Sequence, residues 1–227
     1  MHVGWRAFWM LGLALAGVWL NSPATAADWS RFRGPNGSGV STGQDPLPTA
    51  WSETKNLKWK AELPGPGNSS PIVVGDNVFV TSWSGYADGG EGGSLEDLHR
   101  HLVCIDRNTG KQRWEYKVKA ALPEDSYRGM FAENGYASHT PVSDGEMVYV
   151  YFGKSGIHAV DMEGKHVWNK NVGSDLDGRG WGSASSPILY KDLVIVTATI
   201  ENHSIAAFDK KTGEKKWEQE AEGFGST

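Results

Sequence analysis

The chain has 227 residues, including 11 Trp, 29 Gly and 1 Cys, and its formal net charge is −5. A mildly acidic chain is a poor electrostatic partner for phosphates, which argues against nucleic-acid binding. A single cysteine excludes an internal disulfide framework.

Residues 1–26 have the layout of a secretory signal peptide, with Arg6, an apolar run from Ala7 to Leu20 and small residues up to Ala26. The alternative is a membrane anchor, but about 14 helical residues reach only ~21 Å, short of the ~30 Å hydrocarbon core. We therefore expect cleavage after Ala26, no integral membrane segment in the mature chain, and export to the periplasm, cell envelope or extracellular space. No cysteine lies near the cleavage site, so the sequence gives no support for a lipid-anchored mature form.

Residues 27–56 contain too much Gly and Pro for a regular element. We expect an irregular lead-in segment, ordered because Trp29, Phe32 and Trp51 hold it against the rest of the chain. An alternating apolar and polar strand then begins at Leu57 and contains Trp59.

From residue 57 to residue 227 the sequence repeats. Trp59, Trp114, Trp168 and Trp217 recur at intervals of about 50 residues, near the ~40 to 50 of propeller blades. The last three tryptophans each follow a hairpin turn that starts with Asp and contains Gly, where Asp accepts hydrogen bonds from turn amides and Gly supplies a positive φ. These Asp and Gly residues are Asp106 and Gly110, Asp161 and Gly164, and Asp209 and Gly213.

Each repeat also begins with a Ser/Thr-Pro strand start and holds four short strand-like runs, the content of one propeller blade. We predict an all-β fold, a β-propeller of four-stranded antiparallel blades at about 69–119, 139–172 and 185–220, with almost no helix. Three blades cannot close the usual ring of ~4 to 8. We expect the chain to be the N-terminal part of a longer protein; the alternative is an arc that associates through its open blade edges.

Loops longer than a turn requires are the candidate binding sites. In the first, His99 and His101 could share a metal ion, but no further ligand is placed beside them, so solvated histidines are the simpler interpretation. Asp177 lies in a stretch that resembles a calcium loop without its further spaced oxygen ligands, which favours a solvated turn. We therefore predict no metal site.

Two later insertions precede the first strands of blades, near the expected central channel. Their candidate ligand-binding residues are Arg128, Asn134, His139, Arg179 and Trp181. Arginine, an aromatic ring and an amide at one channel mouth could bind a polar or carbohydrate-like ligand. The alternative is ordinary packing between blades.

The Asp-x-x-Thr-Gly-x-x-x-Trp turns, the Ser-Ser-Pro starts and the opening Phe32-Arg33-Gly34-Pro35-Asn36-Gly37 resemble secreted PQQ-like β-propeller repeat proteins. That family is related by fold to quinoprotein alcohol dehydrogenases and to the outer-membrane assembly propeller BamB. The resemblance covers residues 28–227 and implies that the repeated Trp residues dock neighbouring blades. The resemblance alone suggests PQQ as a cofactor. The residues of this chain do not support it, because the vicinal Cys-Cys pair of the dehydrogenases is missing.

The sequence contains no recognisable catalytic group. We therefore expect an exported, non-catalytic propeller scaffold that binds a protein or polysaccharide partner and needs no cofactor. The alternative is a divergent quinoprotein oxidoreductase whose other site residues lie beyond Thr227. The single Cys104 lies in an apolar run and is expected to be a buried, unreactive side chain.

Overall fold

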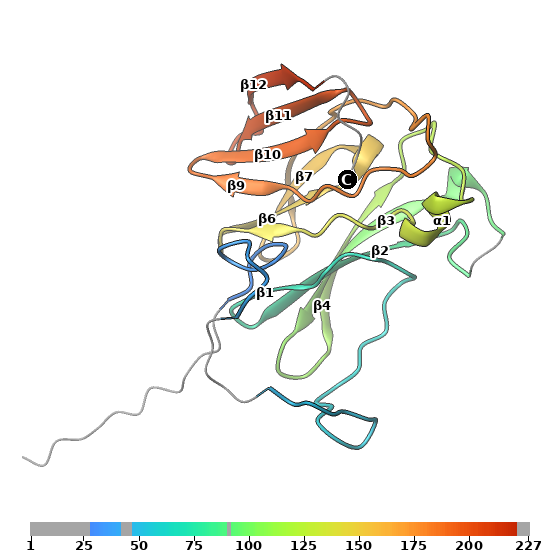
Figure 1. Ribbon diagram of the computed structural model, residues 1–227. Coiled ribbons are helices and arrows are strands. Elements are labelled where there is room, and N and C mark those ends of the chain that lie inside the picture. Colours follow the sequence, from blue (N-terminus) through green and yellow to red (C-terminus); the bar gives the residue numbers. More distant parts are fainter. Residues whose placement is uncertain (1–27, 42–46, 90–91, 222–227) are drawn as a thin grey trace, which may run out of the picture.

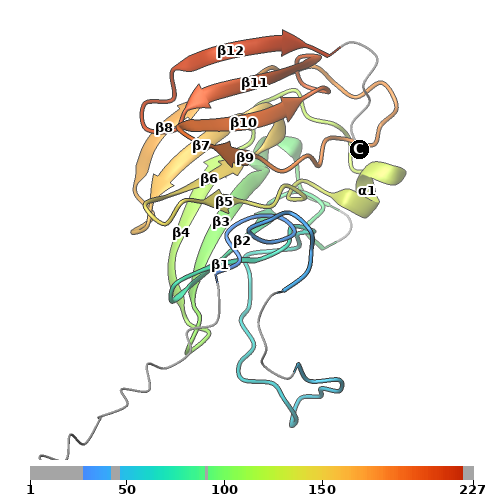
Figure 2. The same ribbon diagram turned by 60° about the vertical axis from the view of Figure 1, so that its left-hand side comes forward.

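A computed structural model of the protein describes residues 28–41, 47–89 and 92–221. It contains three antiparallel sheets of four strands each, which lie one above another in chain order (Figures 1 and 2). The helical content of these residues is the short helix α1 (Met130–Asn134) and two 3-10 turns, Leu95–Asp97 and Gly153–Ser155. The predicted all-β architecture of four-stranded blades is confirmed.

Each sheet is a simple meander in which consecutive strands are neighbours. The first sheet holds β1 (Ile72–Val74), β2 (Asn77–Ser84), β3 (His99–Asp106) and β4 (Gln112–Lys119). The second holds β5 (Val142–Ser143), β6 (Met147–Tyr151), β7 (Ile157–Asp161) and β8 (His166–Lys170). The third holds β9 (Ile188–Tyr190), β10 (Leu193–Ala198), β11 (Ser204–Asp209) and β12 (Lys215–Glu220).

The core lies in the two seams between the sheets. Successive side chains of a strand point to opposite faces, so β6 contributes to both seams. Val148 and Val150 pack with Phe79 of the first sheet, whereas Tyr149 and Tyr151 pack with the third. The continuous apolar run of β6 therefore reflects a strand buried on both faces.

The Asp-Gly hairpin turns are closed by their own side chains. Asp106 Oδ1 accepts hydrogen bonds from the N–H groups of Asn108 (2.9 Å) and Thr109 (2.8 Å), and Gly110 has φ +73°. Asp209 repeats these contacts with Lys211 and Thr212. The turn is thus encoded within about five residues of sequence, as such side-chain to backbone bonds allow.

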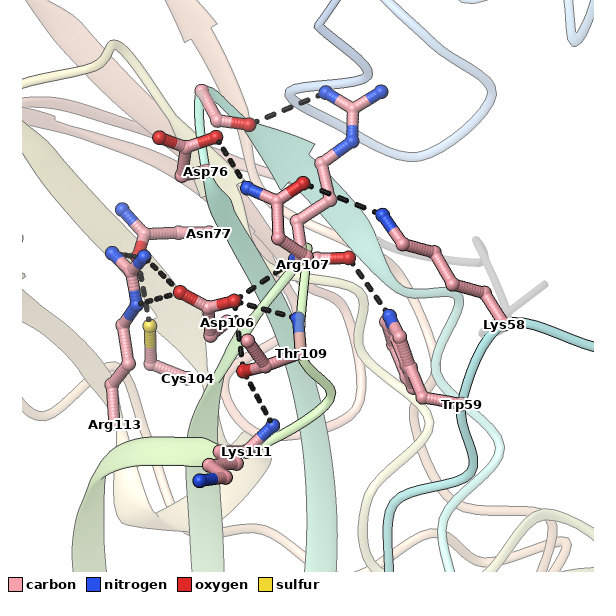
Figure 3. Close-up of polar contacts among 12 residues, drawn as sticks. Lys58, Trp59, Asp76, Asn77, Cys104, Asp106, Arg107, Thr109, Lys111 and Arg113 are labelled. Carbon is pink, nitrogen blue, oxygen red and sulfur yellow. Dashed lines mark hydrogen bonds and ion pairs between the residues drawn. The ribbon is translucent and has the colours of Figure 1, made fainter.

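Three of the repeated tryptophans, Trp59, Trp114 and Trp168, each reach the turn of the next sheet along the chain. Trp59 Nε1 donates to the carbonyl of Arg107 at 2.8 Å (Figure 3). Its ring covers Gly110 so closely that an added Cβ would lie 2.7 Å away. Trp114 covers Gly164, and Trp168 covers Gly213, with equivalent indole hydrogen bonds to Met162 and Lys210. These glycines are needed for close approach as well as for positive φ.

A second row of contacts links the Ser/Thr-Pro strand starts. The backbone N–H of Ser70 donates to Thr140 Oγ1 at 3.0 Å, and the N–H of Thr140 donates to Ser186 Oγ at 2.9 Å. The hydroxyl of one sheet thus accepts from the backbone of the sheet before it. We call this row the hydroxyl rim.

The lead-in segment is attached at one of its three predicted anchors. Trp29 pairs with Val73 of β1, and the carbonyl of Ser30 accepts from the backbone N–H of Ser143 of β5 at 2.9 Å. Phe32 is 48% exposed and Trp51 75% exposed, so the prediction that they pin the segment is wrong. Backbone pairing at the sheet edges holds it instead.

The expected signal peptide, residues 1–26, lies outside the described residues. Among the residues described, no helix is long and apolar enough to cross a membrane.

Candidate functional site: the insertion loops

Two insertion loops from neighbouring sheets meet beside α1. They are residues 120–141, between β4 and β5, and residues 171–187, between β8 and β9, and both lie at the α1 side of the molecule in Figure 1. Asn134 Nδ2 donates to the Trp181 carbonyl at 3.3 Å, and Phe131 packs against Gly182, where an added Cβ would be 2.6 Å from its ring. The loops therefore form one continuous surface.

That surface contains an open groove of about 380 Å³, which we call the loop groove. Its side chains are those of Arg128, Met130, Asp177, Arg179 and Trp181, separated by three glycines. Met130 is 54% and Trp181 47% exposed, and the Arg179 guanidinium lies 5.0 Å from the centre of the Trp181 ring.

Asp177 holds the floor of the loop groove. Its carboxylate accepts from the backbone N–H groups of Arg179 (3.0 Å), Trp181 (2.7 Å) and Gly182 (3.0 Å). Burial alone would raise the pKa of this carboxyl, but the three N–H groups outweigh it and the pKa is lowered. Asp177 is only 9% exposed, so the expected solvated turn is a buried anchor instead.

The structure separates the five predicted ligand-binding residues into two places. Arg128, Arg179 and Trp181 line the loop groove, and Asn134 joins its two loops from behind. His139 is 5% exposed and lies in a buried polar cluster next to the loop groove. Spacing along the chain could not make this division, because both insertions precede blade starts in the same way.

The buried cluster contains two ion pairs that the sequence did not suggest. Arg100 Nη1 lies 2.7 Å from Glu124 Oε1, and Lys154 Nζ pairs with Asp125. The cations come from β3 and a 3-10 turn, both remote in sequence from their partners. No local motif could signal these pairs, since each residue alone resembles an ordinary surface charge.

A third buried carboxylate, Glu201, lies in the same cluster and is 2% exposed. Its Oε1 accepts from Ser183 Oγ, and Ser183 Oγ lies 3.2 Å from His139 Nε2. Glu201 follows β10, where the sequence reads as a polar turn, so reasoning from sequence missed it.

The two histidines of the first insertion do not form a ligand pair. His101 is 1% exposed and is held by Glu115 (2.6 Å) and Ser84 (2.8 Å), so the expectation of two solvated histidines is wrong for it. His99 instead contacts the carbonyl of Asp97 at 2.7 Å. Within residues 28–41, 47–89 and 92–221, no three His, Cys, Asp or Glu side chains are grouped to hold a metal ion.

Comparison with known proteins identifies a family and a shared fold. The family described as outer membrane protein assembly factor BamB matches residues 94–226. The outer membrane protein assembly factor BamB of Burkholderia pseudomallei (strain K96243) is 30% identical over 178 residues, covering 75% of this chain and 36% of that protein. The chain thus spans about a third of the length of this curated relative.

Two solved structures are similar as well. Quinohemoprotein alcohol dehydrogenase from Comamonas testosteroni matches 86% of this chain and 28% of its own, with 21% identity and a TM-score of 0.55. BamB from Moraxella catarrhalis matches 73% of this chain and 55% of its own, with 21% identity and a TM-score of 0.43. The likeness to the dehydrogenase shows a common fold alone.

Proposed function

The chain belongs to the family described as outer membrane protein assembly factor BamB, and from that premise we propose that it is an exported, non-catalytic scaffold that binds a protein partner in outer-membrane assembly. The loop groove is its binding surface. The observation that carries the proposal is the exposed Trp181 with Met130, Arg128 and Arg179 on loops anchored by Asp177. A polysaccharide partner, which the sequence left open, has no support from the relatives.

The composition of the loop groove supports a protein partner. Tryptophan, methionine and arginine are enriched at protein interfaces, and Trp and Arg carry much of the binding energy there. The two guanidinium groups favour a partner segment that contains a carboxylate, while Trp181 and Met130 offer apolar area beside it. Because Asp177 fixes the backbone under these side chains, little ordering is needed on binding.

Site-specific photo-crosslinking in the native host tests this proposal. A photoreactive residue at Met130 keeps Arg128, Arg179 and Trp181 intact, and we expect one discrete adduct with a protein of the outer-membrane assembly machinery. The matched control is the same residue at Leu47, which is 79% exposed on the lead-in segment. Arg179→Ala should weaken the adduct at Met130 about tenfold, since a lost interface Arg costs roughly 1 to 2 kcal/mol. A glycan adduct, or equal adducts at both positions, would contradict the proposal.

The oxidoreductase alternative receives less support from the residues present. Cys104 is the only cysteine, and its Sγ is buried and donates to Asn77 Oδ1 at 3.3 Å. Burial raises the pKa of this thiol to about 12. The described residues therefore do not fit the vicinal cysteine pair of the quinoprotein pattern. Dye-linked alcohol oxidation by the full-length protein with added PQQ and Ca²⁺ would overturn the non-catalytic proposal.

A further inference from the structure

The lead-in segment contains a glycine-rich turn, residues 31–39, that the proposed function does not use, and we call it the arginine turn. The two residues before it, Trp29 and Ser30, pair through their backbones with Val73 of β1 and Ser143 of β5. Because β1 and β5 are edge strands, the arginine turn lies at the edges of the first two sheets (Figure 2). It shares no residue with the loop groove.

The backbone of the arginine turn is closed by its own hydrogen bonds. Three N–H groups, those of residues 34, 37 and 39, donate to carbonyls within the turn. Asn36 Oδ1 also accepts from the N–H of Ser38 at 3.0 Å and from its Oγ at 2.7 Å. Arg33 has φ +61°, a left-handed value that a residue with a Cβ rarely adopts, and the surrounding bonds hold it there. The turn therefore presents its side chains from a fixed backbone.

Two guanidinium groups lie against the same side of this turn sequence. Arg31 Nη2 covers Gly37, where an added Cβ would be 2.8 Å away. Arg33 Nη2 donates to the Ser38 carbonyl at 3.4 Å, and Arg33 Nε lies 3.5 Å from where a Cβ on Gly39 would stand. Both cations are thus placed along three consecutive residues.

These two charges are not neutralised within the part of the chain that the structure describes. Arg31 and Arg33 form no ion pair there, unlike Arg100 and Arg113. Arg31 Nε is buried and has no hydrogen-bond acceptor among the same residues. The carboxylate of Asp28, close by in sequence, accepts from the Gly75 N–H at 2.9 Å. A buried donor without an acceptor is costly, and two unpaired cations on one turn repel each other.

We propose that the arginine turn binds a doubly charged oxyanion, a phosphate or sulfate group held by the guanidinium groups of Arg31 and Arg33. A planar guanidinium presents paired N–H donors that match two oxygens of such a group. Two cations favour a dianion over a single carboxylate, because each charge then has a counter-charge. The turn is already closed by its own bonds, so little ordering is needed on binding.

Titration of the full chain with inorganic phosphate at pH 8 tests the proposal, with chloride as the reference salt at equal ionic strength. We expect saturable broadening of the phosphorus NMR line. If the dissociation constant is about 1 mM, about 20 mM phosphate should also raise the unfolding midpoint by roughly 3 to 7 °C over chloride. Sulfate should compete with phosphate. Broadening that does not saturate, together with equal midpoints in phosphate and chloride, would overturn the proposal.

Three variants locate the site. The double variant Arg31→Gln/Arg33→Gln removes both charges and should abolish saturable broadening. Arg107→Gln is the matched control, since Arg107 also lies at a turn and its guanidinium donates to the Gly75 carbonyl at 3.3 Å; it should bind phosphate as the unaltered chain does. Arg31→Lys keeps the charge but loses the paired donors, so its affinity should fall about tenfold.

Saturable binding that persists in the double variant contradicts the assignment. If the double variant does not fold, Arg31→Lys decides, because an unchanged affinity in that variant also contradicts it. Glycerol 3-phosphate then distinguishes two sources of the same chemistry. Binding as tight as that of inorganic phosphate indicates a phosphate group carried by a larger molecule, whereas exclusion of the ester indicates the free ion.

Discussion

Asp106, at the start of the first hairpin turn, combines two roles, because it closes the turn and pairs with a cationic side chain on the following strand. Asp106 binds turn N–H groups through Oδ1 and the Arg113 guanidinium through Oδ2 (Figure 3). The hydrogen bond from Arg113, then those from Thr109, lower the pKa of this carboxyl below its usual range. The pKa of Asp209 is lowered in the same direction by Thr212.

This lowering predicts a loss of stability in acid. The unfolded Asp carboxyl titrates near 3.9, so between that pH and the lower folded pKa the unfolded chain binds more protons. The contribution of Asp106 is complete above about pH 5 and is lost as the pH falls toward its folded pKa. Urea midpoints at pH 3, 4, 5 and 7 should fall less steeply in Asp106→Asn than in the unaltered chain. Glu133→Gln serves as the control, and identical slopes in Asp106→Asn and the unaltered chain would refute the link.

The Trp residues differ in what covers them, although their motifs match. Trp168 is 7% exposed, whereas Trp217 is 41% exposed. Trp168→Ala should cost about 3 to 5 kcal/mol, because it removes a ring from a packed seam. Trp217→Ala should cost less than about 1 kcal/mol, as expected for a surface site. Urea denaturation of both variants measures the difference, and equal losses would show that Trp168 does not dock the sheets.

At the level of elements, the sheets are joined along two lines. The tryptophans join them at the hairpin turns, and the hydroxyl rim joins them at the strand starts. The proline after each rim residue leaves the β1, β5 and β9 segments without one backbone donor. Cross-sheet bonds at the preceding residue keep these short first strands in place.

Ser186→Ala tests the hydroxyl rim. It removes the acceptor of the Thr140 N–H, and Thr140 is 1% exposed, so we expect a loss of about 1 to 3 kcal/mol. Amide hydrogen exchange at Thr140 should accelerate together with the loss. Ser126→Ala, at an exposed residue of the insertion loop, is the control. Unchanged exchange at Thr140 would mean that another group satisfies this N–H.

The strands and turns were predictable because their signals are local. The Asp-Gly turns and the buried run of β6 each specify structure within a few residues. The strand expected from the alternation in residues 57–63 is wrong, because these residues have no regular secondary structure and Trp59 is held by the turn at Arg107 and Gly110 instead. The loop groove was predictable only in part, since Arg128 and Arg179 stand in different blades. The buried cluster was not predictable, because Arg100, Lys154 and Glu201 meet only after three sheets have packed.

At the level of the whole molecule, the sheets form a directional series. Trp114 and Trp168 each bind the turn of the sheet that follows their own, so each seam joins two unlike surfaces. The middle sheet is buried on both faces, while the third leaves Ile188, Tyr190 and Trp217 40%, 58% and 41% exposed. Stability in such a series depends on intrinsic sheet stability and on nearest-neighbour seams.

The direction of the Trp contacts also matters while the protein is being made. Trp59 and Trp114 bind carbonyls 48 residues further along the chain, and Trp168 binds one 42 residues further. At roughly 5 to 20 residues per second of synthesis, each indole waits several seconds for its partner to leave the ribosome. During that interval the newest sheet presents an uncovered aromatic ring. We expect chaperones to bind nascent chains during each of these intervals.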